Sequence, residues 1–163
     1  MKKALGFSLL EAMVAVAIIA ILAAMAVPSY LYKIVREQIE STMPLTDVAK
    51  TPIAIAWKTE QIMPADNAAA GIPVPDKIVS NLVKSVAVEN GAIHVTFGNR
   101  ANGALKDKIL TLRPAVIEDA PVVPVTWVCG EAEAPEKMVI KGSNRTTLEK
   151  QYLPPMCRAR SNK

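Results

Sequence analysis

The chain has 163 residues, of which 51% are hydrophobic and 21% are charged, and its formal net charge is +4. This length accommodates one modest domain in addition to any N-terminal segment. The small net charge does not by itself imply a nucleic-acid or anionic-membrane partner. The sequence shows no nucleophile–base constellation and no Walker motif, and its single histidine and two cysteines match no zinc-ligand spacing. We therefore predict no catalytic residue, no cofactor and no metal site.

The first 28 residues contain two lysines and then a long apolar run that a single carboxylate, Glu11, interrupts. A secretory signal peptide would explain the lysines and the small-x-small sequence at 24–26. A plain membrane anchor would explain the apolar run from Ala12 to Val27. Neither interpretation explains Glu11, because a charge at hydrocarbon depth costs roughly 2.5 to 3.5 kcal/mol unless it is paired.

The stretch GFSLLEAMVAVAIIAILAAMAVPSY resembles the N-terminus of type IV pilins and their pseudopilin relatives. The resemblance implies that residues 1–6 are a basic leader, that a prepilin peptidase cuts after Gly6, and that Phe7 becomes an N-methylated N-terminus. It also implies that Glu11 meets the Phe7 amine of a neighbouring subunit. Within one chain, that amine lies one helical turn before Glu11. A buried pair of this kind between subunits stabilises the correct axial register.

The same resemblance implies that residues 7–28 form an apolar helix that crosses the membrane before assembly. Pro28 falls where the family has its helix proline, and it removes one backbone hydrogen bond from the helix. Ala20 departs from the glycine that many family members carry. Because alanine is the best helix former, local melting of this helix should be harder by about 0.5 to 1 kcal/mol.

Residues 29–58 are predicted to form an amphipathic helix half, since apolar and charged side chains alternate there at three- and four-residue spacings. Pro44 and Pro52 are each expected to bend or end this helix. Residues 59–80 are rich in proline, alanine and glycine and have no apolar period, which predicts a loop of variable surface.

Residues 81–163 are predicted to form an antiparallel sheet and a disulfide-bounded C-terminal region. Two alternating runs flank Asn90-Gly91, the strongest short hairpin signal, and KDKILTLRPAV and VPVTWVCG supply two further strands. Cys129 and Cys157 follow an export-type N-terminus, which predicts one disulfide. The segments KILTLRP, VTWVCG and YLPPMCR also resemble the last strands and disulfide-bounded segment of type IVa pilins.

The predicted fold class is therefore α+β. A long N-terminal helical spine, apolar and membrane-embedded in its first half before assembly, packs against a four-stranded antiparallel sheet with a disulfide-closed C-terminal segment. Within the sheet, alternation turns His94 away from its apolar neighbours, which predicts a solvent-facing histidine. Trp127, beside Cys129, is expected to pack around the disulfide, and Asn144 begins a glycosylation triplet that is common by chance.

The chain after Cys129 has seven basic residues and four acidic ones. One interpretation is a mixed, solvated surface. The other is a basic stripe repeated along a fibre, which would bind DNA through its phosphates in a salt-sensitive way. The candidate contacts for this second interpretation are Arg158, Arg160 and Lys163.

The resemblance identifies the chain as the precursor of a type IVa pilin, and it implies a non-enzymatic subunit that is stored in the inner membrane and polymerised into an extracellular fibre, or fimbrium. The resemblance implies roles in adhesion, twitching motility and DNA uptake. It implies as partners other copies of the chain, a prepilin peptidase, an inner-membrane assembly platform, minor pilins and an outer-membrane secretin, with DNA or host-surface ligands in addition. The alternatives are a minor pilin, a type II secretion pseudopilin, and an exported enzyme with a lipid-facing anchor.

Overall fold

The computed structural model describes residues 6–160, apart from the side chains of residues 26–29. The chain divides into two compact units, of which the first extends to Ile34 and the second begins at Val35. Helix α1 (Leu9–Thr42) begins in the first unit and ends in the second. Pro28 lies within α1, and its side chain is outside the described residues, as is the whole of Lys163.

The helices of the second unit are the last turns of α1, the 3-10 turn η1 (Met43–Thr46) and helix α2 (Asp47–Glu60). Pro44 lies in η1, where the α-helical geometry is interrupted as expected. Pro52 lies inside α2 without ending it. The helix ends instead at Gln61, which adopts a left-handed conformation with φ of 57°.

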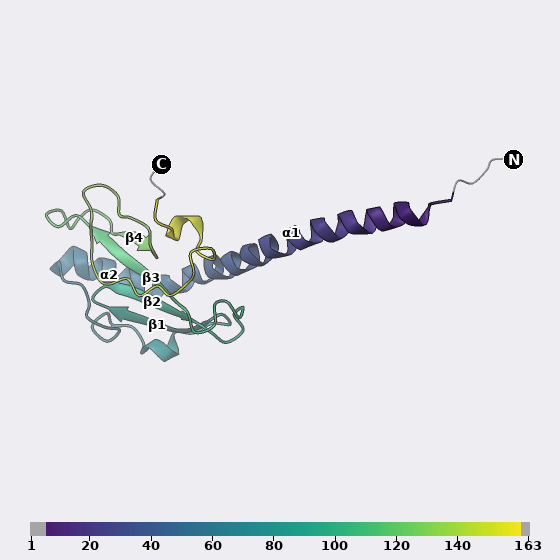
Figure 1. The fold of residues 1–163 in the computed structure, drawn as a ribbon. Coiled ribbons are helices and arrows are strands. Elements are labelled where there is room, and N and C mark those ends of the chain that lie inside the picture. The colour runs from purple at the N-terminus through teal and green to yellow at the C-terminus, as the bar shows by residue number, and fades with distance from the viewer. Residues whose placement is uncertain (1–5, 161–163) are drawn as a thin grey trace. The chain divides into compact units, whose positions relative to one another are not determined.

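The sheet of the second unit is an antiparallel meander in the order β1 (Val83–Glu89), β2 (Ala92–Phe97), β3 (Ile109–Val116), β4 (Thr126–Cys129), which confirms the four-stranded prediction (Figure 1). A two-residue strand, β5 (Val139–Ile140), adds to β3. The turn between β1 and β2 has positive φ at Asn90 and Gly91, as the hairpin signal requires. Two further 3-10 turns are η2 (Pro75–Lys77) and η3 (Pro155–Cys157).

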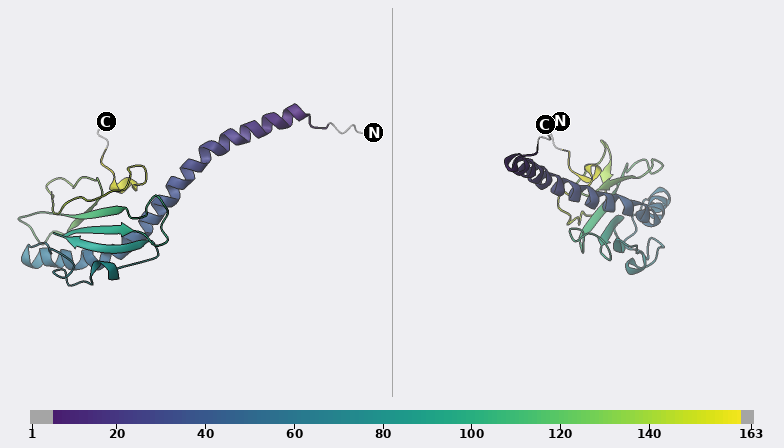
Figure 2. Two further views of the ribbon diagram at one scale, coloured as in Figure 1. Left: turned by 60° about the horizontal axis from the view of Figure 1, so that its bottom comes forward. Right: turned by 90° about the vertical axis from the view of Figure 1, so that its right-hand side faces the viewer.

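One face of the sheet lies over α2 and the end of α1 within the second unit (Figure 2). The core between these layers is apolar, and its fully buried members include Ile39 and Ile53 from the helices and Phe97 and Leu110 from the strands. Leu153, near the end of the chain, is buried in the same core. The expected packing of helix against sheet is therefore confirmed for the second unit.

The loop between α2 and β1 is held to the edge strand by one buried side chain, that of Asn67. Its amide nitrogen donates to the carbonyl oxygens of Pro73 at 2.8 Å and Val86 at 3.0 Å, and its oxygen accepts from the Val88 N–H at 2.6 Å. Edge strands otherwise present unpaired backbone groups that can recruit other chains. By pairing with Val86 and Val88, Asn67 reduces the number of unpaired backbone groups on this edge strand.

The prediction that His94 faces solvent is wrong, because the residue is only 4% exposed. After β5 the chain crosses the face of the sheet on which His94 lies. Gly142 packs against Ala92, and the Arg145 backbone N–H donates to the Thr111 hydroxyl at 3.0 Å. That hydroxyl lies 3.0 Å from His94 Nδ1, so the crossing segment and the histidine share one partner.

Candidate assembly site

The N-terminus of α1 is capped by Ser8, whose hydroxyl oxygen accepts from the Glu11 backbone N–H at 3.2 Å. The Ala12 N–H donates to the Ser8 carbonyl oxygen at 3.1 Å, which begins the helical hydrogen-bond pattern. Ser8 therefore stands at the N-cap position, and Glu11 is the third residue of the first turn. This cap was not predicted above, although Ser-x-x-Glu before an apolar run is its sequence signature.

Glu11 carries the only charge between Gly6 and Tyr32. Its position in the first turn suits a carboxylate, because the helix N-terminus carries partial positive charge. Among residues 6–160, no cationic side chain lies within ion-pair distance of Glu11. Its exposed carboxylate is therefore available to a cation from outside the described part of the chain.

The junction between Gly6 and Phe7 lies before the helix begins and is exposed. The Phe7 side chain is 79% exposed, and no atom lies within 4 Å of the position that a Cβ on Gly6 would occupy. Exposed, non-helical segments are the ones that proteases reach most readily. The geometry is therefore compatible with cleavage at this bond.

Helix α1 exposes mainly apolar side chains between Leu9 and Met25. Large exposed residues run from Leu9 to Met25, and a shallow hollow on the helix surface is lined by Leu9, Ala12, Met13, Val16, Ala17 and Ala20. The helical stretch Leu9–Glu60 contains a window long and apolar enough to cross a membrane, and none of that window is buried. Small residues on such a surface allow other helices to approach closely.

The predicted disulfide between Cys129 and Cys157 is present, with an S–S distance of 2.02 Å. Gly130, the residue after Cys129, has φ of +56°, and a Cβ there would come within 2.8 Å of the Cys157 carbonyl oxygen. That oxygen also accepts from the Glu131 N–H at 2.9 Å. The bridge and these contacts hold the C-terminal segment against β4, and Trp127 packs against the same core.

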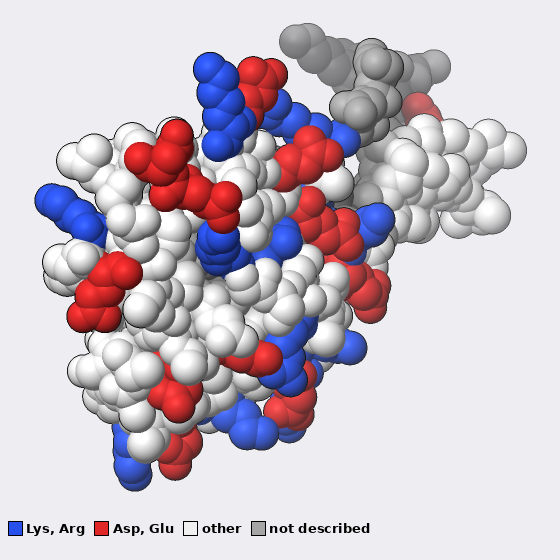
Figure 3. Space-filling model, turned by 90° about the vertical axis from the view of Figure 1, so that its left-hand side faces the viewer, with Lys and Arg blue, Asp and Glu red and all other residues white. Residues whose placement is uncertain are grey.

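The basic residues of the C-terminal segment are largely engaged within the second unit. Three of them form ion pairs with acidic side chains: Arg145 with Glu89, Lys141 with Glu118 and Lys150 with Glu131. Figure 3 accordingly shows a face on which Lys and Arg side chains are interspersed with Asp and Glu.

The three candidate DNA-contact residues differ in whether their side chains are free to bind phosphate. Arg158 donates from Nε to the Leu153 carbonyl oxygen at 2.9 Å, so its guanidinium is partly engaged by the backbone. Arg160 is exposed, and Lys163 is outside the described residues. DNA contact by these three residues stays a prediction.

Each of the two units matches a known protein family or motif. A family model described as pilin, a bacterial filament protein, matches residues 35–158, and a prokaryotic N-terminal methylation motif matches residues 1–27. The chain belongs to the pilin family. The methylation motif includes the junction between Gly6 and Phe7, and the pilin match includes the sheet and both cysteines.

This pilin is similar along most of its length to major pilins and fimbrial proteins. It is 31% identical over 159 residues to the type IV major pilin protein PilE of Neisseria gonorrhoeae, which covers 94% of this chain and 93% of that protein. It is 32% identical over 158 residues to the fimbrial protein EcpC of Eikenella corrodens, covering 94% and 90%. It is also 34% identical over 125 residues to the type IV major fimbrial protein FimA of Dichelobacter nodosus, covering 65% and 80%.

Membership in this family makes the chain a structural subunit of a pilus, a surface filament formed by self-polymerisation. The family supports the pilin interpretation over the alternatives of a secretion pseudopilin and an anchored enzyme.

Proposed function

We propose that this pilin is the major subunit of a type IV pilus and that it assembles through its N-terminal helix. A prepilin peptidase removes residues 1–6, Phe7 is N-methylated, and residues 7–28 hold the subunit in the inner membrane until it is polymerised. The observation that carries the proposal is the exposed apolar helix with Glu11 as its single charge. Such a surface is stable only in lipid or against other apolar helices.

Glu11 provides the register of assembly in this proposal. Cleavage creates a cationic amine on Phe7, and in a bundle of helices the Glu11 carboxylate of one subunit pairs with the Phe7 amine of the next. A subunit inserted at the wrong height leaves both charges unpaired in an apolar environment, at a cost of several kcal/mol. The Ser8 cap supports this role, because it fixes the first helical turn on which Glu11 stands.

The remaining parts have separate roles. Residues 29–58 and the sheet and disulfide of residues 81–163 form the fibre surface together with a variable loop at residues 59–80. The finished fibre mediates adhesion, twitching motility and DNA uptake. The machinery implied is an inner-membrane assembly platform, minor pilins that begin or decorate the fibre, and an outer-membrane secretin through which it leaves.

Mass spectrometry of fibres sheared from the cell surface tests this proposal. We expect this chain to be the most abundant protein, with a mature N-terminus at Phe7 that carries one methyl group. Gly6→Leu should block cleavage and leave the precursor in the membrane, whereas Ala4→Leu, a matched change within the leader, should be cut normally. A mature N-terminus at Val27, or absence of this chain from sheared fibres, would contradict the proposal.

A further inference from the structure

The sequence contains two Asn-Gly pairs, Asn90-Gly91 and Asn102-Gly103. Asparagine before glycine is prone to spontaneous deamidation, because glycine has no Cβ to hinder attack by its backbone nitrogen on the asparagine side chain. The reaction also requires that this nitrogen and the side-chain amide carbon approach each other, which a hydrogen-bonded or crowded backbone prevents. The two pairs differ in this respect.

The backbone around Asn90-Gly91 is fixed on both sides. The Gly91 N–H donates to the Pro64 carbonyl oxygen at 2.9 Å, and the Asn90 N–H donates to the Ala65 carbonyl oxygen at 3.1 Å. Gly91 is buried, and the position of a Cβ on it lies 2.7 Å from Met63 Sδ. Attack by the Gly91 nitrogen requires the loss of its hydrogen bond and a change in the hairpin turn, so the fold protects this pair.

The backbone nitrogen of Gly103 has no such restraint. The pair Asn102-Gly103 lies in the loop that joins β2 to β3, and Gly103 is exposed, with no atom within 4 Å of its Cβ position. Among residues 6–160, no acceptor lies within hydrogen-bond distance of the Gly103 N–H. No hydrogen bond therefore has to break before this nitrogen reacts.

The side-chain oxygen of Asn102 already has a hydrogen-bond donor. The Ala104 N–H donates to Asn102 Oδ1 at 2.9 Å, which folds the side chain back over the residue that follows it. When the Gly103 nitrogen bonds to Asn102 Cγ, negative charge develops on Oδ1. A fixed N–H at that oxygen stabilises such a charge, so the loop favours the reaction as well as permitting it.

We propose that Asn102 is a site of spontaneous deamidation in the folded protein and that Asn90 is protected from it. Solvent base removes the proton from the Gly103 nitrogen, which bonds to Asn102 Cγ. The Cγ–Nδ2 bond then breaks, and the leaving group takes a proton from water and departs as ammonia. One water molecule opens the resulting succinimide to aspartate or isoaspartate. The reaction concerns the folded second unit alone, so it is independent of the pilus function.

The isoaspartate product weakens the contact between the β2–β3 loop and α1. The Asn102 N–H donates to Gln38 Oε1 of α1 at 2.9 Å, and the Asn102 carbonyl oxygen accepts from the Leu105 N–H at 2.8 Å. Leu105 is fully buried in the core. Isoaspartate routes the backbone through the former side chain and lengthens it by one carbon atom, which shifts both hydrogen-bonding groups. The second unit therefore loses stability as the protein ages.

Isotope labelling and peptide mapping of the full chain test the assignment. The folded protein is incubated in detergent in a mildly alkaline buffer made with oxygen-18 water, and it is then digested with trypsin in ordinary water. Only deamidation that precedes digestion incorporates the label. The expected peptides, residues 85–100 and 101–106, carry Asn90 and Asn102 separately. We expect label to accumulate at Asn102 roughly tenfold faster than at Asn90, the factor expected when one barrier includes the loss of a backbone hydrogen bond.

Gly103→Ala is the matched variant, since its added Cβ meets no neighbouring atom but hinders the attacking nitrogen. It should lower the rate at Asn102 several-fold. In denaturant the wild type should lose the difference between the two asparagines, because both backbones are then free. Equal labelling of Asn102 and Asn90 in the folded protein, an unchanged ratio in denaturant, or an unchanged rate in Gly103→Ala would each overturn the proposal.

Thermal unfolding tests the consequence for stability. Aged wild-type protein should have a lower Tm than fresh protein, whereas Gly103→Ala aged in the same way should keep its Tm. An isoaspartate-specific methyltransferase measures how much of the aged protein carries the rearranged backbone. An unchanged Tm in protein that is rich in isoaspartate would overturn the inferred weakening of the contact between the loop and α1.

Discussion

The two units of this pilin expose opposite kinds of side chain. In the first unit, large apolar residues face outward, with Leu9 81% and Ile21 62% exposed. In the second unit, Ile53, Phe97 and Leu110 are fully buried. A single domain in water buries most of its large apolar side chains, so the first unit is suited to lipid or to neighbouring helices, whereas the second is stabilised by its own core.

Three polar side chains show a related difference. In the second unit Asn67 and the Thr111 hydroxyl are satisfied by other parts of the same chain. In the first unit, Glu11 has no cationic partner among residues 6–160. The comparison implies that substitutions of the exposed residues in the first unit affect assembly and that substitutions in the core of the second unit affect folding. Both tryptophans, Trp57 and Trp127, belong to the second unit, so their fluorescence reports on its folding alone.

The largest expected effect is that of Glu11→Ala on assembly. The variant should still be cut after Gly6, because the leader and the scissile bond are intact, yet it should yield little or no fibre. Breaking one side of a buried pair typically costs about 3 to 5 kcal/mol, and in a polymer the cost recurs at every subunit. Glu11→Gln should be intermediate, because it keeps an acceptor oxygen and loses the charge.

The measurement is precursor cleavage on a gel together with the yield of sheared fibre from the same cells. Glu60→Ala, which removes an exposed carboxylate from the second unit, is the matched control and should assemble normally. The tryptophan unfolding curve of Glu11→Ala in detergent should overlay that of the wild type. Normal fibre yield from Glu11→Ala would show that this charge does not determine assembly.

The next effect belongs to the second unit. Cys157→Ser should lower the free energy of unfolding by about 2 to 5 kcal/mol, since the disulfide no longer restricts the unfolded chain. Denaturant titration of the full-length protein, followed by tryptophan fluorescence, measures the change. Reductant should destabilise the wild type by a similar amount and have no effect on the variant. If Cys157→Ser instead prevented cleavage after Gly6, the two units would not be separable in the way we infer.

A smaller loss is expected from Gly142→Ala. Gly142 has φ of +77°, and a Cβ there would come within 2.6 Å of the Ala92 Cβ. Backbone strain of this kind costs about 1 to 3 kcal/mol, and the segment that crosses His94 should loosen. Gly103 is the matched control, because no atom lies within 4 Å of its Cβ position. Gly103→Ala should leave the free energy of unfolding nearly unchanged. Equal losses from both variants would contradict the inference that the segment containing Gly142 packs closely against Ala92.

The features that the sequence predicted are those with local signals. The start of the chain carries a contiguous motif, the Asn90-Gly91 hairpin lies between alternating runs, and the disulfide follows from the only two cysteines in an export context. Each signal occupies a short window, so the chemistry of neighbouring residues is enough to predict it.

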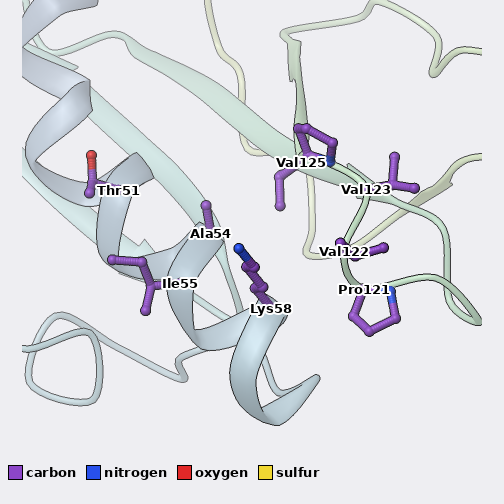
Figure 4. Close-up of a pocket in the computed structure, with 9 residues that line it drawn as sticks. Thr51, Ala54, Ile55, Lys58, Pro121, Val122, Val123 and Val125 are labelled. Atoms are coloured by element: carbon purple, nitrogen blue, oxygen red, sulfur yellow. The ribbon is translucent and has the colours of Figure 1, made fainter.

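The features that the sequence did not predict depend on residues far apart in the chain. His94 is buried because the segment around Arg145 covers it. Asn67 makes its buried hydrogen bonds to β1, about twenty residues later in the chain. Alternation gives the face on which a strand residue lies, but it does not tell whether another segment covers that face. A hollow between α2 and the loop around Val122 (Figure 4) likewise depends on segments more than sixty residues apart in the chain.

The smallest expected effect is a dependence of second-unit stability on pH. Burial lowers the pKa of His94 below its usual value of 6.5, the nearby Arg145 guanidinium lowers it further, and Glu89, whose Oε2 is 3.5 Å from His94 Nε2, opposes them. The folded protein therefore binds the proton less readily than the unfolded chain does. Stability should be fully present above about pH 6.5 and decrease as the pH falls through and below that value.

His94 is the only histidine, which makes the test specific. Thermal unfolding of the full-length protein, followed by tryptophan fluorescence between pH 7.5 and pH 5.5, should show a Tm that decreases toward the acidic end. His94→Gln keeps a hydrogen-bonding side chain beside the Thr111 hydroxyl and cannot titrate, so its Tm should vary less over this range. Carboxylates titrate mainly below this window, so they contribute little to the difference between the two proteins. An equally steep pH dependence in His94→Gln would mean that the buried histidine is not its source.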